Sequence, residues 1–260
     1  MEALTLEAPA GGIHVARWRP ENARAREPHS PIVLLHDSLG CVALWRGFPE
    51  RLAEATGREV IAYDRLGFGH SAPFPGQLPM SFIGDEAGTT FAALRKALGL
   101  DRFVLLGHSV GGGMGIEAAG QHADGCEALI TVAAQAYMEP RILAGIREAE
   151  AAFRDPEQLR RLARYHGEQA EWVLHAWVKT WQTEAFSDWH LDDALARVSC
   201  PVLAIHGERD EFGSPEQAHH IARLSAGSAE SCILACGHVP HRECPEELAA
   251  IVAEFLSASR

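Results

Sequence analysis

The chain has 260 residues, of which 47% are hydrophobic and 22% charged, and its formal net charge is −12. This length allows one large α/β domain or two small ones, and we favour one. The negative charge disfavours nucleic acid and anionic membrane surfaces as partners, because no cationic stripe is available to displace counterions. No apolar run approaches the ~18 to 20 residues that span a bilayer, and the N-terminus lacks a signal-like pattern, so we expect a soluble cytoplasmic protein.

The cysteines favour a reduced protein. None of the six belongs to a C-x-x-C pair, so most are expected to be small core residues rather than a disulfide framework. Cys232, Cys236 and His238 could together hold a metal, but the strands and catalytic residues described below already use these positions. We therefore expect neither a metal nor an organic cofactor.

The first half of the chain alternates strand and helix patterns. Residues 4–6 and 13–18 predict an antiparallel hairpin at a sheet edge, and residues 19–30 predict a surface connection. Continuous apolar runs, typical of strands buried on both faces, occupy residues 31–35, 59–63, 102–106 and 127–133. Helical spacing of apolar residues occurs at residues 44–56, 82–98 and 110–122.

The pattern changes between residues 135 and 197, where helical patterns rich in aromatic side chains replace the strands. We interpret this segment as a helical cap inserted into a core domain formed by residues 1–134 and 198–260. Trp177 and Trp181 lie one helical turn apart, so they either line a substrate pocket or only anchor the cap. The core resumes with predicted strands at residues 200–206 and 231–235, and a helix at residues 245–257 closes it.

A serine at a strand-to-helix turn is the candidate nucleophile. Residues 107–111 read GHSVG, the G-x-S-x-G pattern in which small residues let the backbone turn sharply around the serine. Ser109 could otherwise be only a helix-capping serine. A nucleophilic serine needs a base, and the base needs an orienting acid. Asp210 and His238 each follow a predicted strand, in the chain order Ser, Asp, His.

Four motifs together resemble the α/β-hydrolase family over almost the whole chain. They are HDSLG at residues 36–40, DRLGFGHS at 64–71, GHSVG at 107–111 and GHVPHRECP at 237–245. The resemblance implies the α/β-hydrolase fold, a mostly parallel twisted sheet flanked by helices, here with an inserted helical cap. It further implies a triad of Ser109, Asp210 and His238, and an oxyanion hole formed by the backbone N–H groups of Ser38 and Val110.

Other side chains compete for these roles. His241 is the nearest competitor for the base, Glu208 and Glu211 flank the acid, and Glu139 is the first carboxylate after the strand that precedes the cap. The family pattern selects His238 as the base. Some relatives supply the acid from the loop after the strand that precedes the cap, but residues 134–136 of that loop offer no carboxylate here, so Asp210 is favoured as the acid.

The loop after the first buried strand departs from the family. Asp37 stands where glycine is usual, although Asp tolerates positive φ better than most residues. Its carboxylate could repel anionic substrates, or the side chains of His36 and Asp37 could merely hydrogen-bond the loop into shape. His108, which precedes the nucleophile, is expected to shape the pocket.

The resemblance implies acyl transfer through an acyl-enzyme, and we expect hydrolysis of a small, neutral or weakly polar carboxylic ester. An acyltransferase, a carbon–carbon bond hydrolase or a cofactor-free perhydrolase can use the same triad, and a hormone-type receptor can keep it with little turnover. Dehalogenases and epoxide hydrolases are disfavoured, because those relatives carry Asp at the position of Ser109. The sequence leaves the natural substrate and the oligomeric state open.

Overall fold

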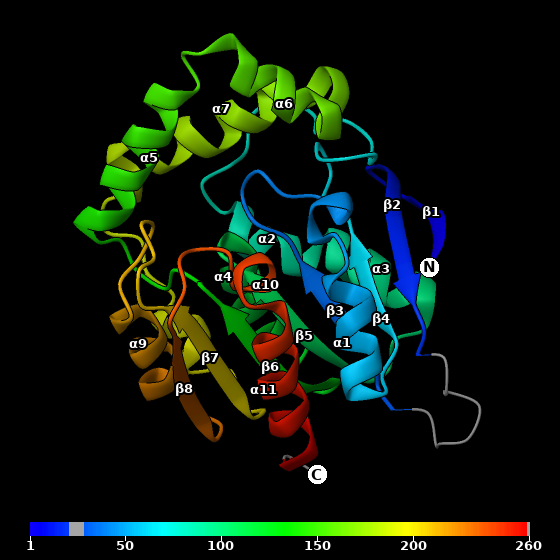
Figure 1. Cartoon of the computed structure of the whole chain (residues 1–260). Helices are drawn as coiled ribbons and strands as arrows, with labels where there is room; N and C mark the ends of the chain where they lie inside the picture. Colours follow the sequence, from blue (N-terminus) through cyan, green and yellow to red (C-terminus); the bar gives the residue numbers. More distant parts are fainter. Residues whose placement is uncertain (21–28, 259–260) are drawn as a thin grey trace.

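Eight strands form one sheet at the centre of the molecule (Figure 1). The computed structural model describes residues 1–20 and 29–258, so most of the predicted connection at 19–30 lies outside the described residues. The strands lie in the order β1-β2-β4-β3-β5-β6-β7-β8. Their bounds are β1 Glu2–Ala8, β2 Gly11–Trp18, β3 Ile32–Leu35, β4 Val60–Tyr63, β5 Phe103–His108, β6 Cys126–Val132, β7 Val202–Gly207 and β8 Ala229–Leu234.

The sheet is mostly parallel. Strand β2 is antiparallel to both of its neighbours, β1 and β4, and the remaining pairs are parallel. The residues of β3, β4, β5 and β7 are buried throughout, as a parallel sheet covered on both faces requires. The predicted fold class and the antiparallel edge hairpin are therefore confirmed.

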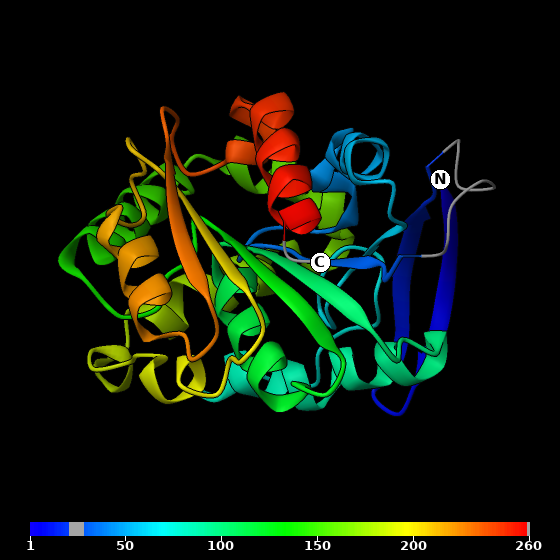
Figure 2. The same cartoon turned by 90° about the horizontal axis from the view of Figure 1, so that it is seen from below.

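Helices cover both faces of the twisted sheet (Figure 2). On one face lie α1 (Phe48–Thr56) and α11 (Pro245–Ala258), which bury one apolar cluster against the strands. The helices of the opposite face bury a second cluster, and they are α2 (Phe82–Gly88), α3 (Thr90–Leu98), α4 (Val110–Gln121), α8 (Asp192–Leu195) and α9 (Glu216–Leu224). The sheet is thus the middle of three layers.

Two predicted helices are shorter than their apolar spacing suggests. Residues 82–98 form α2 and α3 instead of one helix, because Thr89 leaves helical geometry (φ −115°, ψ −89°) and its Oγ1 donates to Asp85 O at 2.6 Å. The prediction for residues 44–56 is wrong at its start, where a 3-10 turn η2 (Val42–Trp45) precedes α1. Arg46, at φ 53°, separates that turn from the helix.

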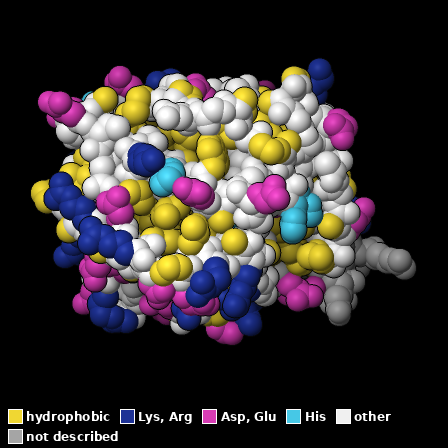
Figure 3. Space-filling view, turned by 90° about the horizontal axis from the view of Figure 1, so that it is seen from above, with side chains coloured by type: hydrophobic (Ala, Val, Ile, Leu, Met, Phe, Trp, Pro, Cys, Tyr) yellow, Lys and Arg dark blue, Asp and Glu magenta, His cyan; other side chains and the backbone are white. Residues whose placement is uncertain are grey.

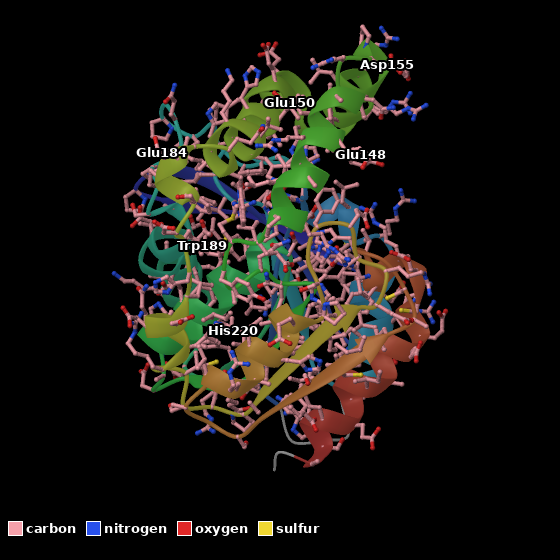
Figure 4. All side chains as sticks on the ribbon, turned by 90° about the vertical axis from the view of Figure 1, so that its left-hand side faces the viewer. Glu148, Glu150, Asp155, Glu184, Trp189 and His220 are labelled. Atoms are coloured by element: carbon pink, nitrogen blue, oxygen red, sulfur yellow. The ribbon has the colours of Figure 1, made fainter. Side chains whose placement is uncertain are left out.

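Three helices arch over the carboxyl ends of the parallel strands (Figure 1). They are α5 (Pro140–Ala152), α6 (Pro156–His166) and α7 (Ala170–Trp181), joined and followed by the short turns η3 (Gly167–Gln169) and η4 (Glu184–Phe186). Figure 4 shows Glu150 of α5 and Asp155, in the turn before α6, above His220 of α9. Helix α8 lies within the range predicted as cap, but it packs on α4 and α9 of the core.

The face that carries these helices has hydrophobic side chains gathered over its middle and charged side chains around them (Figure 3). Of the large hydrophobic residues in the described part of the chain, Met1, Met80 and Ile233 are exposed. None of the described helices has the length and apolarity to cross a bilayer.

The connection from β5 to α4 is the tightest turn of the core. Ser109 lies between them with φ 56° and ψ −127°, a backbone conformation that residues other than glycine rarely adopt. A Cβ on Gly107 would collide with the backbone of Gly111, and a Cβ on Gly111 would collide with the carbonyl oxygens of Leu35 and His36. The small residues of the G-x-S-x-G pattern are therefore required by close backbone approach, as predicted.

We expect Gly111→Ala to destabilise the protein by about 1 to 3 kcal/mol, because backbone atoms cannot yield to the added methyl group. Gly84→Ala is the matched control, since a Cβ there meets only the end of the Glu117 side chain at 3.6 Å and a helical alanine is favoured over glycine. Urea unfolding of both variants provides the measurement. Equal unfolding midpoints for the two variants would contradict the close-packing argument.

Candidate active site

Three side chains from three loops form a hydrogen-bonded chain at the carboxyl edge of the sheet. The Nε2 atom of His238 lies 3.1 Å from Ser109 Oγ, and its Nδ1 lies 2.8 and 2.9 Å from the two carboxylate oxygens of Asp210. Each of the three residues is at least nine-tenths buried. Donation of Nδ1–H to the carboxylate leaves Nε2 free to accept the serine proton, which is the arrangement a general base requires.

The Asp210 carboxylate has neighbours besides the imidazole of His238. Its Oδ1 accepts a hydrogen bond from Phe212 N at 2.7 Å, and His206 Nε2 lies 3.2 Å from Oδ2. Burial alone would raise the pKa of Asp210, but the contacts with His206 and His238 outweigh it and lower the pKa below its usual range. The carboxylate therefore stays charged at neutral pH.

His206 was given no role in the sequence analysis. It is the fourth residue before Asp210, at the end of the same buried strand, and its ring is fully buried. The signal available for it was its polar side chain near the end of an otherwise apolar strand, just before the loop that carries the candidate acid.

The competing residues lie elsewhere. Glu208 is exposed, and Glu139 accepts a hydrogen bond from Ser214 Oγ at 2.9 Å. The ring of His241 is buried 4.7 Å from that of Trp45 and does not line the cavity described below. The geometry therefore brings the three favoured residues together and leaves these alternatives outside.

Two backbone N–H groups near the candidate nucleophile have no acceptor among the described residues. Val110 is the first residue of α4, where an N–H has no partner within the helix. Within the described residues, no acceptor is bonded to the N–H of Ser38, which lines the same cavity as Ser109. Both groups are free to bind a developing oxyanion, the role expected of them.

Asp37 fits its loop without a left-handed backbone. Positive φ among the described non-glycine residues occurs at Arg46, Ser109 and Ala133, so the tolerance of Asp for such angles is not needed here. Burial would raise the pKa of the Asp37 carboxyl, but His108, whose Nδ1 lies 3.9 Å from Oδ1, helps to hold it well below its usual range. Asp37 thus lines the cavity as an anion.

His108 does not shape the pocket as expected. Its ring is 1% exposed and lies behind the site, where Nε2–H donates to the backbone oxygen of His238 at 2.7 Å. The His108 side chain does not line the cavity, and its polar neighbours are the backbone oxygen of His238 and the carboxylate of Asp37. His108 supports the backbone of the candidate base instead of lining the cavity.

The site opens into a cavity of about 230 Å³ between the core and the arching helices. Its described lining contains no Lys or Arg and is mainly apolar. The lining residues are Asp37, Ser38, Leu39, Ser109, Gln135, Ile142, Ile146, Ala149, Phe153, Trp177, Trp181, Phe212, His238 and Val239.

Trp177 and Trp181 of α7 line this cavity. Trp181 also anchors its helix, because its ring packs 4.9 Å from Phe186 and 5.5 Å from Trp189. Trp181 therefore both lines the cavity and anchors its helix. Trp177 is half-buried and packs against Phe212, which itself contacts the ring of His238.

Gln135 is a second residue that the sequence analysis missed. Its Oε1 lies 3.4 Å from Ser109 Oγ, while its Nε2 donates to Phe212 O at 3.2 Å. The amide thus bridges the loops after β6 and β7 beside the serine. Its position just after a buried strand was the signal available, but an amide was not expected beside the serine in a loop that lacks a carboxylate.

No group of three or more metal-ligating side chains gathers among the described residues. His238 directs Nδ1 toward Asp210, and Cys232 and Cys236 stay free thiols in the described part of the chain.

Comparisons with known proteins agree with the fold. A model of the alpha/beta hydrolase family matches residues 32–251. The chain is 25% identical, over an alignment of 294 positions, to a proline iminopeptidase of Lactobacillus helveticus (strain DPC 4571), and the alignment covers 98% of each protein.

The chain is also similar to solved structures. The crystal structure of proline iminopeptidase from Mycobacterium smegmatis is similar with a TM-score of 0.73 and 26% identity, covering 99% of this chain and 98% of that one. The enol-lactonase from Burkholderia xenovorans LB400 is similar with a TM-score of 0.75 and 21% identity, covering 98% of this chain and 100% of that one, and supports the fold alone.

We expect Asp210→Asn to lower kcat by about 10⁴-fold with a small change in KM, because the imidazole loses both its orienting partner and the charge that stabilises imidazolium. Glu208→Gln is the matched control, one exposed carboxylate removed from the same loop, and should change kcat less than about twofold. Steady-state kinetics on an activated ester measures both. The reverse ranking would move the acid to Glu208.

Proposed function

The chain belongs to the α/β-hydrolase family, and from this premise we propose that it hydrolyses a small carboxylic ester through an acyl-enzyme intermediate. The observation that carries the proposal is the hydrogen-bonded chain from Asp210 through His238 to Ser109, which ends in the cavity. A hydroxyl in this position can transfer its proton to the imidazole as it attacks a carbonyl carbon.

Acylation follows from these contacts. Ser109 Oγ forms a bond to the ester carbonyl carbon while His238 Nε2 takes the serine proton, and Asp210 stabilises the resulting imidazolium. The carbonyl oxygen becomes an oxyanion that accepts hydrogen bonds from the N–H groups of Ser38 and Val110. Collapse of this intermediate breaks the ester C–O bond, and His238 returns the proton to the departing alcohol.

Deacylation repeats the same steps with water. His238 Nε2 takes a proton from the water as its oxygen attacks the acyl carbon, and the second oxyanion uses the same two N–H groups. Breaking the bond to Ser109 Oγ releases the carboxylic acid and returns the proton to serine. These steps consume one water and require no cofactor.

The size and lining of the cavity support a small, neutral or weakly polar ester. About 230 Å³ is below the range of roughly 300 to 1,000 Å³ usual for pockets that hold drug-sized ligands. The walls supplied by α5 and α7 are apolar, and the one ionised carboxylate, that of Asp37, repels an anionic substrate.

Hydrolysis of an amide next to an N-terminal amine is the second candidate. The likeness to proline iminopeptidases over 98% of the chain favours it, and the Asp37 carboxylate in the cavity could face a substrate ammonium. The substrate panel below includes a prolyl arylamide for this reason.

We expect Ser109→Ala to lower ester hydrolysis by at least about 10⁴-fold while the urea unfolding midpoint stays near that of the parent protein, since triad members act as a unit. A fluorophosphonate should label the parent protein at Ser109, as read by peptide mass spectrometry, and should not label the variant. Near-normal turnover of the variant, or a label on another serine, would overturn the proposal.

In a series of aryl esters, we expect kcat/KM to peak at short to medium acyl groups and to fall for long ones. Trp177→Ala should move the peak toward longer chains, raising the relative kcat/KM of an ester with one more methylene by about tenfold, because that side chain forms a cavity wall. Trp172→Ala is the matched control on the same helix. Its indole donates to Gly76 O and lies outside the cavity, so the acyl preference should not change.

The same panel separates the alternatives. Faster cleavage of the prolyl arylamide than of every ester would favour the second candidate. Labelling of Ser109 without hydrolysis of any ester or amide would favour a carbon–carbon bond hydrolase, an acyltransferase, a perhydrolase or a low-turnover receptor.

A further inference from the structure

A buried arginine beside the candidate site has no part in the steps above. Arg65 follows β4, is 4% exposed, and its guanidinium carbon lies 4.1 Å from the ring centroid of Phe68. Burying a cation is costly unless it is paired and hydrogen-bonded. Among the described residues, however, its guanidinium forms no ion pair, and its Nε has no hydrogen-bond partner.

The hydrogen bond that the Arg65 side chain does make leads to the candidate oxyanion hole. Nη2 donates to the backbone oxygen of Asp37 at 2.9 Å. The same oxygen accepts from His36 Nδ1 at 2.8 Å and from Gly40 N at 3.2 Å. The carbonyl of Asp37 and the N–H of Ser38 belong to one planar peptide group, so fixing the oxygen fixes the direction of the N–H.

Arg65 also acts on this peptide through His36. The backbone N–H of Arg65 donates to His36 Nε2 at 3.1 Å, which requires that the other ring nitrogen carry the proton. Nδ1–H is therefore available to donate to the Asp37 oxygen. Burial, assisted by the neighbouring Arg65 charge, holds the pKa of His36 well below its usual value, so the ring stays neutral.

The carboxylate of Glu86 compensates the positive charge of Arg65 without contacting it. It is 8% exposed and accepts a hydrogen bond from the Tyr63 hydroxyl at 2.8 Å. Burial lowers the pKa of Arg65, and the Glu86 carboxylate opposes that effect. Since arginine keeps its proton in proteins, a positive charge lies against the carbonyl end of the peptide.

We propose that Arg65 is a positioning residue that, together with His36, clamps the Asp37–Ser38 peptide so that the Ser38 N–H points at the oxyanion. The proposal rests on the proposed function, because it assigns this N–H to transition-state stabilisation. Hydrogen bonds to a carbonyl polarise its peptide and strengthen donation by the N–H at the other end. The clamp also prevents the peptide from turning its carbonyl toward the developing negative charge. An oxyanion is stabilised best by donors that already point at it and need not reorganise during the reaction.

The test removes the cation without leaving an unpaired buried charge. In the double variant Arg65→Met/Glu86→Gln both charges are gone, and in the control Glu86→Gln the clamp remains. We expect the double variant to lose about 10- to 100-fold in kcat relative to the control, less than the roughly 10² to 10³ that follows removal of an oxyanion donor, with KM within about threefold. Its affinity for butylboronic acid, whose tetrahedral adduct on Ser109 places an oxygen in the oxyanion position, should fall by the same factor.

A residue that only stabilises the core would change the unfolding midpoint but not the boronate affinity. If the double variant does not fold, His36→Gln provides the test, because it keeps every charge and removes the ring donor. We expect about a 10-fold parallel loss of kcat and boronate affinity in that variant. In either folded variant, kcat and boronate affinity within about twofold of the control or parent protein would overturn the clamp. A parent protein that hydrolyses no substrate and takes no fluorophosphonate would instead overturn the proposed function.

Discussion

The backbone turn at Ser109 is the constraint on which the rest of the site depends. A residue other than glycine at φ 56° costs on the order of 1 to 3 kcal/mol, and such strain persists only where the surrounding structure imposes it. Here β5 is buried on both faces, and the glycines on either side of the serine let α4 approach β3 and β5 at backbone contact. The strained turn holds the hydroxyl at the sheet edge, and the loops after β7 and β8 then need only to bring an acid and a base to it.

Asp210 and Asp37 are carboxylates at this edge whose surroundings differ. Asp210 is fully buried and accepts hydrogen bonds from His238 and from the backbone of Phe212, so its charge is directed at the imidazole. Asp37 is half-buried and lines the cavity, and the Nδ1 of His108 lies 3.9 Å from its Oδ1. The first carboxylate orients the base, whereas the second is placed to influence which molecules enter.

Local patterns were sufficient to predict most of the strands and the elbow. Buried parallel strands are continuous apolar runs whose carboxyl ends meet at one edge, so Ser109, Asp210 and His238 could be placed there from sequence, and the resemblance to α/β-hydrolases then selected His238 over His241. What the sequence could not supply depends on contacts between distant segments. Gln135 and His206 acquire partners only in the folded chain, and His108 contacts the backbone of His238 instead of lining the cavity. The break at Thr89 interrupts an apolar spacing that runs unbroken through both helices, so periodicity alone could not locate it.

The two candidate oxyanion donors are supported in different ways, and the departure from the family at Asp37 accounts for the difference. Val110 is held by the elbow and by the helix it begins. The peptide before Ser38 has no such support, and glycine at position 37 would leave it freer to rotate than aspartate does. Asp37 restricts that rotation, and its carbonyl accepts hydrogen bonds from three donors, one of them on a buried cation. A carboxylate next to the oxyanion position would by itself oppose the developing negative charge. The positive charge of Arg65, applied to the other end of the same peptide, offsets that opposition, so the loop can carry an acidic side chain and still present a donor to the oxyanion.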